Sequence, residues 1–472
     1  MKHVHFIGIC GTAMAPIAAM MGRAGWRVTG SDKGIFPPMS EYLNAAGVSY
    51  YVGFHPERMK KPDLVVVGNF IGPSNPELAA AQSRDTMCQS YPEVLSQNFI
   101  KPESIVVAGT YGKTTMTALL AWIWNTAGKD PSYMSAGILK NFPDGARIGK
   151  SDWSIIEGDE YPASRAHPVP KFSYYRPKYL LLTGAQHDHL DVYPREEEYV
   201  ALFSTLVGSL PAQGLVVAAA DRPHIEEILT HAIAPVVRYA RKESTTPHDW
   251  SLAIHERNKG ATVFSIFGPH GESLGALRTM LLGDESLDHF AGAAALAHHC
   301  GISPKQIAHA LETFQGVRRR LEVRGEETGI TVIDEFGHSP SKASAALRAI
   351  KLSFPEAHII AVYEPNIGSR VASAHILYRN AFSLAHKVLV PKLSSTKLKA
   401  GDEPRMDGDA LARTIKEGNP ECEVNHEGDD ETLVTHIKKI AVRGDVVVFL
   451  GSHGFRGMIE QTLEELKMTN NK

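Results

Sequence analysis

Cysteine and excess charge are both scarce in this sequence, and each shortage excludes some classes of protein. The 472 residues include four cysteines, at positions 10, 88, 300 and 422. Their spacing matches neither a zinc motif nor a disulfide framework, so reduced thiols in the cytoplasm are expected. The formal net charge of −3 gives no reason to expect nucleic acid or an anionic membrane as a partner.

Long apolar runs and an amino-terminal leader are also missing. No run approaches the roughly 18 apolar residues that a membrane span requires. A strand is expected at once, at residues 3–7, which leaves no room for a signal peptide. Hydrophobic residues still make up 43% of the chain, enough for several cores. We therefore expect a cytoplasmic protein of about three domains.

The most informative stretch is 106–116, Val-Val-Ala-Gly-Thr-Tyr-Gly-Lys-Thr-Thr-Met. An apolar strand leads into a glycine-rich turn, a lysine, two threonines and a helical pattern. Such a turn directs backbone N–H groups at a phosphate, the lysine adds positive charge, and the first threonine can reach a phosphate-bound Mg²⁺. An ordinary strand–turn–helix is the alternative. The combination favours an ATP site made by Gly109, Thr110, Gly112, Lys113, Thr114 and Thr115.

A second glycine-rich turn follows the first expected strand. It reads Gly8-Ile9-Cys10-Gly11-Thr12, and Ser31-Asp32 close the next strand. A dinucleotide fold has this plan, with glycines near phosphate and an acid farther on, but Cys10 stands where that motif has its second glycine. NAD, the pyrophosphate of a UDP-sugar and a purely structural turn are all compatible with the pattern. The phosphate loop later in the chain favours the UDP-sugar.

Strand and helix patterns alternate almost throughout, which predicts α/β domains on parallel sheets. Helices are expected near 13–24 and 290–299. A polar segment at 96–104 and an arginine cluster at 318–320 suggest boundaries between three domains. Domains 1–100 and 318–472 are expected to be Rossmann-like, and domain 101–317 is expected to bind ATP. The expected strands are 4–7, 26–29, 64–67, 153–157, 179–183, 215–219, 330–334, 358–363, 387–390 and 445–450.

In this order, the motifs at 8–14, 30–32, 75–77 and 109–115 resemble those of the Mur ligase family. The shortened phosphate loop, with Val107 in place of the first glycine, is similar to the loop of that family. The first motif and the run at 36–40 look most like the branch that joins murein tripeptide to UDP-N-acetylmuramate in cell-wall recycling. The resemblance implies three α/β domains and an ATP- and Mg²⁺-dependent amide-bond ligase that forms an acyl phosphate. It also adds Asn75 to the UDP-sugar residues.

The resemblance assigns metal binding to Glu157, which ends an expected strand, and to His189, which follows another. Thr114 is the further implied Mg²⁺ ligand. A solvated glutamate, a chance polar loop or a transition-metal pair with His187 are the alternatives, but the position beside the phosphate loop favours Mg²⁺. The family's carbamylated lysine is replaced by Ser204, as in the branches whose acceptor is UDP-N-acetylmuramate.

In the third domain, the resemblance nominates Arg320 for the γ-phosphate of ATP, although a surface arginine cluster is the alternative. Glu335 and His338, in the run Asp-Glu-Phe-Gly-His-Ser-Pro at 334–340, are implied to face the nucleotide. Lys113, His189, Arg320 and His338 are thus the expected catalytic residues.

The chain departs from the family where adenine and the peptide would bind. Ser286 and His289 stand at the positions of the adenine-binding asparagines, and Asn366 replaces an arginine expected near the peptide carboxylate. The simplest interpretation is a ligase whose substrate choice has changed. Murein tripeptide is the expected amine substrate, and L-alanine or another amine is the alternative. A weakly active nucleotide- and UDP-sugar-binding paralogue is a second alternative. A nicotinamide-dependent oxidoreductase ranks last, because it would not use Lys113. The predicted partners are small-molecule substrates, and the sequence does not predict the oligomeric state.

Overall fold

The structure is a computed structural model that describes residues 1–164, 168–189, 192–258, 260–394, 403–452 and 454–468. It forms two compact units. The first contains Met1–Glu256, Val263–Thr279 and Glu285–Val317, and the second contains Arg257–Thr262, Met280–Asp284 and Arg318–Lys472. No helix in the described ranges is long and apolar enough to cross a membrane.

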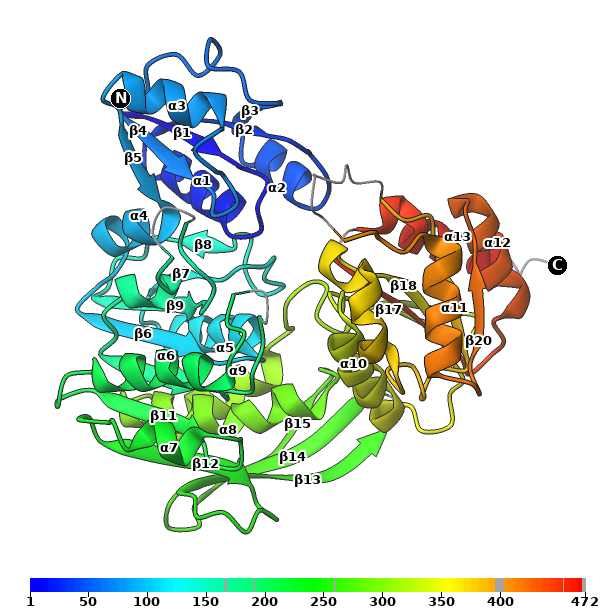
Figure 1. The fold of residues 1–472 in the computed structure, drawn as a ribbon. Coiled ribbons are helices and arrows are strands. Elements are labelled where there is room, and N and C mark those ends of the chain that lie inside the picture. The colour runs from blue at the N-terminus through cyan, green and yellow to red at the C-terminus, as the bar shows by residue number, and fades with distance from the viewer. Residues whose placement is uncertain (165–167, 190–191, 259, 395–402, 453, 469–472) are drawn as a thin grey trace. The chain divides into compact units, whose positions relative to one another are not determined.

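The first unit begins with a parallel sheet of five strands in the order β3-β2-β1-β4-β5 (Figure 1). Phe6 of β1 packs with α1 and α2, whereas Ile7 packs with α3 on the other face. The strand order reverses at β1, so the turn after β1 lies where sheets of this kind bind ligands. The elements are β1 (His3–Ile7), α1 (Met14–Arg23), β2 (Arg27–Asp32), α2 (Met39–Ala45), β3 (Ser49–Val52), β4 (Leu64–Val67), α3 (Pro76–Ser83), β5 (Met87–Ser90) and α4 (Tyr91–Asn98).

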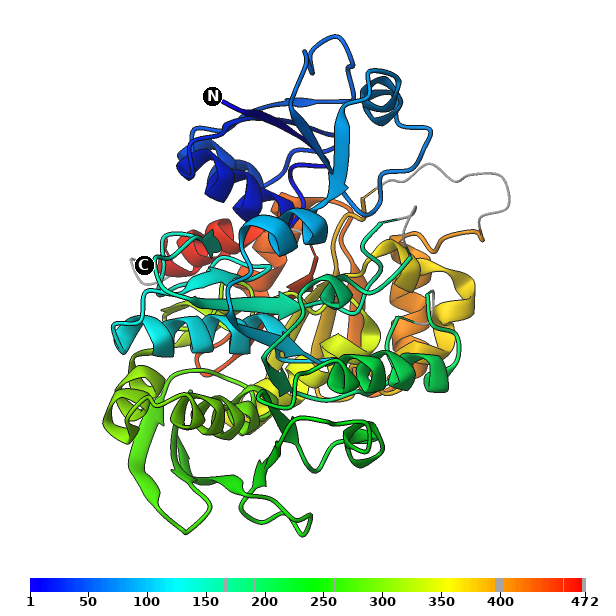
Figure 2. The same ribbon diagram turned by 90° about the vertical axis from the view of Figure 1, so that its left-hand side faces the viewer.

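A sheet of ten strands follows, in the order β15-β14-β13-β12-β11-β10-β6-β9-β7-β8, with helices along it (Figure 2). Strands β6, β10 and β11 carry almost only buried residues, as expected for parallel strands covered on both faces. The strands are β6 (Glu103–Ala108), β7 (Ser132–Met134), β8 (Ala146–Arg147), β9 (Trp153–Gly158), β10 (Tyr179–Leu182), β11 (Leu215–Ala219), β12 (Val236–Arg241), β13 (Trp250–Asn258), β14 (Ala261–Phe267) and β15 (Ser273–Thr279). The helices are α5 (Lys113–Thr126), η1 (Lys171–Tyr174), α6 (Glu196–Gly208), α7 (Ile225–Leu229), α8 (Asp284–His299) and α9 (Pro304–Thr313).

Parallel pairing aligns the carboxyl ends of the central strands of this sheet. Ala108 at the end of β6 pairs with Gly158 of β9 on one side and with Leu182 of β10 on the other. The segments that follow these three strands therefore emerge at one edge. This edge carries the phosphate loop, Glu157 and the residues after β10.

The second unit is built on a sheet of six strands in the order β16-β17-β21-β18-β19-β20. Within the described ranges, β16 runs antiparallel to β17, and the other neighbouring strands of this sheet run parallel to one another. Helices α10 and α11 pack on one face, and α12 and α13 pack on the other. The elements are β16 (Glu322–Glu327), β17 (Ile330–Glu335), α10 (Pro340–Ser353), β18 (Ile359–Glu364), η2 (Ile367–Arg370), η3 (Ala372–Tyr378), β19 (Lys387–Val390), α11 (Gly408–Gly418), β20 (Glu423–His426), α12 (Asp430–Ile440), β21 (Val446–Gly451), η4 (Phe455–Gly457) and α13 (Met458–Met468). The predicted α/β class with parallel sheets is confirmed.

Candidate active site

The phosphate loop is shaped by two glycines with positive φ. Gly109 has φ 130° and Gly112 has φ 79°, conformations that glycine adopts without strain. A Cβ atom at Gly109 would lie 2.7 Å from the carbonyl oxygen of Gly184, and one at Gly112 would lie 2.8 Å from Cδ2 of His289. The loop is therefore confined on both sides, and its backbone leads directly into the N-terminus of α5.

Lys113, the first residue of α5, holds its amine inside this loop. Its Nζ donates to the carbonyl oxygen of Gly109 at 2.6 Å and lies 2.9 Å from Oε2 of Glu160. Burial disfavours the charged amine, but the carboxylates of Glu160 and Asp159 outweigh burial and raise the pKa of Lys113. A fixed positive charge thus sits at the N-terminus of α5, where anions bind most readily.

Thr114 and Glu157 meet beside this charge. The Thr114 hydroxyl donates to Oε1 of Glu157 at 2.9 Å, and the Ala136 N–H donates to Oε2 at 2.9 Å. Mg²⁺ prefers oxygen ligands and commonly takes only one or two from protein, with phosphate and water completing its shell. Within the described ranges, no group of three or more His, Cys, Asp or Glu side chains could hold a metal. The pair therefore fits a Mg²⁺ ion shared with a phosphate.

Glu160, which the sequence analysis did not select, joins Lys113 to His189. The carboxylate is fully buried, and its Oε1 lies 3.3 Å from Nε2 of His189 and accepts a hydrogen bond from Tyr199 at 3.3 Å. Burial disfavours charge on the imidazole, but Glu160 outweighs it and raises the pKa of His189. The available signal was the acidic run 157–160, which begins at the end of the buried strand β9.

The remaining threonines of the loop have different surroundings. The Thr110 hydroxyl donates to the carbonyl oxygen of Gln186 at 2.6 Å, which ties the loop to the segment after β10. Thr115 is buried in the first turn of α5, next to Thr114. Thr110 thus has a clear structural contribution in addition to its expected contact with ATP.

The two residues of the altered adenine motif lie on α8. Nδ1 of His289 lies 2.7 Å from the Tyr239 hydroxyl, and the ring lies beside Gly112. Burial, with a smaller effect of Arg222, lowers the pKa of His289 to about 3, so the ring is neutral at physiological pH. Ser286 lies one turn earlier on the helix and is half-buried. The structure thus places His289 directly beside the phosphate loop.

The turn after β1 has its backbone fixed by Asp32. The Asp32 carboxylate accepts hydrogen bonds from the N–H groups of Cys10 at 2.8 Å and Gly34 at 3.3 Å. Gly8 has φ 88°, whereas Gly11 and Thr12 are exposed on the turn. Burial and the Asp32 charge raise the pKa of the Cys10 thiol to about 12, so this cysteine is not a reactive thiolate.

Ser31 and Asn75 both bind Glu77, a second residue that the sequence analysis did not select. The Ser31 hydroxyl donates to the Glu77 carboxylate, and Oδ1 of Asn75 accepts from the Glu77 N–H at 2.9 Å as the N-cap of α3. Tyr51 and the His55 N–H also donate to the carboxylate, at 2.5 and 2.7 Å. Although burial opposes the charge, these hydrogen bonds and that from His5 lower the pKa of Glu77 to about 2.

In the second unit, the predicted residues gather at the carboxyl end of β17. Arg319 is anchored to the carbonyl oxygen of Gly451 at 2.7 Å, whereas the Arg320 guanidinium lies over the Phe336 ring, 5.0 Å from its centre. Oε2 of Glu335 accepts from the Leu321 N–H at 2.7 Å, and burial raises the pKa of this carboxyl group. Nδ1 of His338 lies 2.9 Å from the carbonyl oxygen of Phe336.

Comparison with known proteins matches three consecutive segments to one family. Residues 3–100 match the Mur ligase family catalytic domain, residues 107–297 the Mur ligase middle domain and residues 319–453 the Mur ligase glutamate ligase domain. A UDP-N-acetylmuramate–L-alanyl-γ-D-glutamyl-meso-2,6-diaminoheptandioate ligase from Haemophilus influenzae is 31% identical, over 79% of this chain and 82% of its own. The chain belongs to the Mur ligase family.

Other Mur ligases are about as similar. A UDP-N-acetylmuramate–L-alanine ligase from Rubrobacter xylanophilus is 30% identical over 98% of this chain and 99% of its own. The crystal structure of a murein peptide ligase from Psychrobacter arcticus superposes with a TM-score of 0.74 at 26% identity, covering 99% of both chains. The predicted family, three-domain fold and enzyme class are confirmed, so this Mur ligase is an ATP-dependent amide ligase that acts on small molecules.

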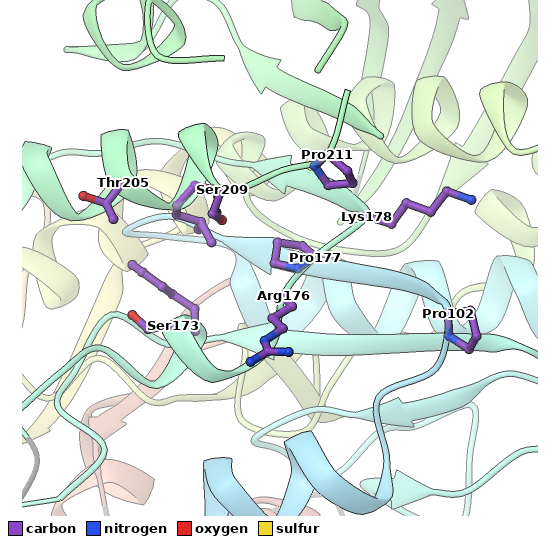
Figure 3. Close-up of a pocket in the computed structure, with 10 residues that line it drawn as sticks. Pro102, Ser173, Arg176, Pro177, Lys178, Thr205, Ser209 and Pro211 are labelled. Atoms are coloured by element: carbon purple, nitrogen blue, oxygen red, sulfur yellow. Dashed lines mark hydrogen bonds between the residues drawn. The ribbon is translucent and has the colours of Figure 1, made fainter. Parts of the chain in front are cut away.

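A cavity of ≈ 460 Å³ in this Mur ligase lies away from the phosphate loop (Figure 3). Its lining includes Pro102 and Lys178, which directly precede β6 and β10, and Ser209, which follows α6. These are the amino ends of parallel strands, whereas the loop follows the carboxyl end of β6. The cavity is therefore at the opposite edge of the sheet from Lys113 and Glu157, and it is not part of the candidate active site.

Proposed function

We propose that this Mur ligase joins UDP-N-acetylmuramate to murein tripeptide, L-alanyl-γ-D-glutamyl-meso-diaminopimelate, while ATP is converted to ADP and phosphate. The product would return cell-wall peptide to peptidoglycan synthesis. The convergence of Lys113, Thr114 and Glu157 at one edge of the sheet carries the proposal. The Haemophilus relative, which carries the name of this reaction, supports the choice of substrates.

The chemistry requires activation of a carboxylate, which is a poor electrophile. In the first step, an oxygen of the substrate carboxylate attacks the γ-phosphorus of ATP, and ADP leaves. In the second step, the amine attacks the carbonyl carbon of the acyl phosphate, phosphate leaves and the nitrogen releases a proton. Lys113 and the N-terminus of α5 would offset the negative charge of the phosphates. Mg²⁺, when bound by Thr114 and Glu157, would supply further charge neutralisation.

The other predicted residues keep their proposed roles. The turn from Gly8 to Thr12, at the start of α1, would bind the pyrophosphate of the UDP-sugar. Asp32 would hold this turn through the Cys10 N–H, whereas Ser31 and Asn75, which contact Glu77, remain proposed residues of the UDP-sugar site. His189 would bind a second Mg²⁺. Arg320, Glu335 and His338 are the proposed nucleotide contacts of the second unit.

Release of ADP by the full-length protein tests this proposal. The assay contains UDP-N-acetylmuramate, ATP and Mg²⁺, with murein tripeptide, L-alanine or no amine, and mass spectrometry identifies the product. We expect rapid ADP release and an amide product with the tripeptide. Preference for L-alanine would instead support the activity of the Rubrobacter relative, which is similar to this chain to the same degree. If the protein binds ATP and UDP-N-acetylmuramate but forms no amide product, the proposed reaction is contradicted.

A further inference from the structure

The cavity at the amino ends of β6 and β10 has one positively charged side chain that is available to a ligand. Arg176, between η1 and β10, lines this cavity and is exposed (Figure 3). Within the described ranges, its guanidinium forms neither an ion pair nor a hydrogen bond. Lys178, the other cation of the lining, is already paired, because its Nζ lies 2.6 and 2.7 Å from the two carboxylate oxygens of Glu103. One available guanidinium suits one singly charged carboxylate, which it can bind through two parallel hydrogen bonds.

The backbone fixes the position from which Arg176 extends. Its φ is 45°, in the left-handed region that residues other than glycine rarely adopt. The Ser104 hydroxyl donates to the carbonyl oxygen of Arg176 at 3.2 Å and accepts from the Lys178 N–H at 3.0 Å. Such a strained conformation persists only where the surrounding structure enforces it, and it is common at ligand sites. The turn therefore holds the arginine at the cavity at a cost in backbone energy.

Most of the cavity wall is apolar. Phe172 and Leu206, which are 2% and 3% exposed, line it together with three proline rings (Pro102, Pro177 and Pro211). The hydroxyl groups of Thr205 and Ser209 also line it, but both donate to backbone carbonyl oxygens of α6, at 2.8 and 2.6 Å. The volume of ≈ 460 Å³ lies within the range of about 300–1,000 Å³ that is usual for small-molecule sites. The wall therefore suits an apolar group that is attached to the carboxylate.

Helix η1 links the cavity to the candidate active site. The N–H of Phe172 donates to the carbonyl oxygen of Asp159 at 3.2 Å, and the buried Lys171 forms an ion pair with the Asp159 carboxylate. Asp159 directly precedes Glu160, whose carboxylate lies 2.9 Å from Nζ of Lys113. A ligand that contacts Phe172 thus contacts a residue bonded to the segment that positions Glu160.

Helix α6 makes a second link. Leu206 lines the cavity, and Tyr199 precedes it by seven residues, about two helical turns, so both lie on the same face. The Tyr199 hydroxyl donates to Oε1 of Glu160 at 3.3 Å. Two elements therefore carry both a part of the cavity wall and a contact of Glu160.

We propose that this cavity is a regulatory site for a small apolar carboxylate, with the carboxylate on Arg176 and the apolar group against Phe172 and Leu206. The ligand is not a substrate, because the cavity lies at the opposite edge of the sheet from Lys113. Occupation of the cavity is coupled to nucleotide binding through η1 and α6. Because such coupling is reciprocal, the ligand and the nucleotide change each other's affinity by the same factor.

Calorimetric titration of the full-length protein with four probes tests the binding. The probes are 3-phenylpropionate, 3-phenylpropanol, which lacks the charge, acetate, which lacks the apolar group, and 2-phenylethyl phosphate, which carries more charge. We expect 3-phenylpropionate to bind at least tenfold more tightly than any of the other three. Tighter binding of the phosphate would overturn the carboxylate class, and equal affinity for the acid and the alcohol would overturn the role of a cation.

Two variants separate the charge from the space. Arg176→Gln should remove the preference for the acid over the alcohol, and Thr205→Trp, a change at an exposed position, should weaken both by filling the cavity. The matched control is Arg195→Gln, which removes an exposed arginine at the other end of α6 and should leave every affinity unchanged. If 3-phenylpropionate binds Arg176→Gln as tightly as the wild type, the proposed site is wrong.

Titration with ADP and Mg²⁺ tests the coupling without turnover. Saturating 3-phenylpropionate should change the Kd of ADP at least threefold in the wild type and leave it unchanged in Arg176→Gln, and ADP should change the Kd of 3-phenylpropionate by the same factor. An unchanged Kd of ADP in the wild type would overturn the regulatory role. These measurements read binding alone, so their outcome is independent of whether the protein forms the proposed amide.

Discussion

Lys113 and Glu160 form a buried ion pair, so a substitution of the lysine has two separate consequences. We expect Lys113→Ala to lower ATP turnover by a factor on the order of 10²–10³, because a preorganised charge on the phosphates is lost. The same substitution leaves the fully buried Glu160 without its main partner and should destabilise the fold by about 3 kcal/mol. ADP release and chemical denaturation measure the two effects.

The double variant Lys113→Ala/Glu160→Gln separates them. A neutral amide at position 160 should recover much of the lost stability, while ADP release stays low. Near-normal ADP release by Lys113→Ala would show that the phosphates are bound elsewhere. A double variant no more stable than the single one would show that the ion pair is not the source of the destabilisation.

Glu157 is predicted to act through Mg²⁺. Glu157→Gln keeps the size of the side chain and its contact with Thr114 but removes the charge, so the Mg²⁺ concentration for half-maximal ADP release should rise by about 10–100-fold. Calorimetry of ADP binding with and without Mg²⁺ checks the same point without turnover. Glu103→Gln, on the other end of β6 and paired with Lys178, is the matched control. Equal Mg²⁺ dependence of both variants would remove Glu157 from the metal site.

The sequence predicted that Lys113 and Glu157 lie at strand ends of one sheet, and the structure places them there, but it did not predict which neighbouring side chain is buried. Their positions beside a strand and a glycine turn made these two placements predictable, whereas their roles stay predictions. Glu160 was missed, since an acidic run after a strand does not reveal which acid is buried. In the arginine cluster, Arg319 is anchored to the backbone of Gly451, whereas Arg320 stays the predicted nucleotide contact.

At the scale of elements, strongly buried strands were predicted best. Strands β4, β11 and β19 match the expected ranges residue for residue, because their side chains are almost all apolar. Strands β13 and β15 were not predicted, since charged and half-exposed residues interrupt their patterns. Strand β14 between them was also missed, although it is mostly buried and has no charged residue. Helix α8 begins at Asp284 rather than near 290, because its first turn is polar and lacks the apolar spacing of the rest.

Glu77 links several elements of the N-terminal sheet, and this predicts a measurable effect of pH. Its carboxylate accepts from β2 through Ser31 and from β3 through Tyr51, and its pKa falls from 4.5 to about 2. A group with a lowered pKa stabilises the fold above its unfolded-state value, and this contribution is lost as the pH falls toward the folded-state value.

The free energy of unfolding of the wild type should therefore decrease more steeply than that of Glu77→Gln between about pH 4.5 and 2. Urea denaturation at a series of pH values measures the difference, to which other acids contribute equally in both proteins. Parallel curves would show that Glu77 has no special part in stability at low pH.

For the whole molecule, the sequence predicted three α/β segments. The structure also shows that two short segments of the middle part belong to the second unit, which no local sequence pattern indicates. The short segments Arg257–Thr262 and Met280–Asp284 belong to the second unit, although they interrupt the middle part of the sequence. Membership of a compact unit depends on contacts between residues far apart in the chain. Strand and helix patterns report only neighbours, so they could not show this.

Whether the N-terminal sheet binds a UDP-sugar or NAD⁺ follows from the function of the whole chain, and the contacts of Asp32 lead to a test. A dinucleotide site uses an acid at the end of the second strand to bind a ribose hydroxyl. Here both oxygens of that carboxylate already accept backbone N–H groups, from Cys10 at 2.8 Å and Gly34 at 3.3 Å. The turn itself still offers the N-terminus of α1 to a pyrophosphate.

Isothermal titration of the full-length protein should therefore show UDP-N-acetylmuramate binding at least tenfold more tightly than NAD⁺. UDP alone should retain part of this affinity, because the pyrophosphate is the group that the turn binds, whereas UMP should bind more weakly than UDP. Asp32→Asn should weaken all uridine ligands together, since its role is to hold the turn and not to select the sugar. Tighter binding of NAD⁺ than of UDP-N-acetylmuramate would reverse the assignment of the N-terminal sheet, and equal affinity for UDP and UMP would show that the turn does not bind the pyrophosphate.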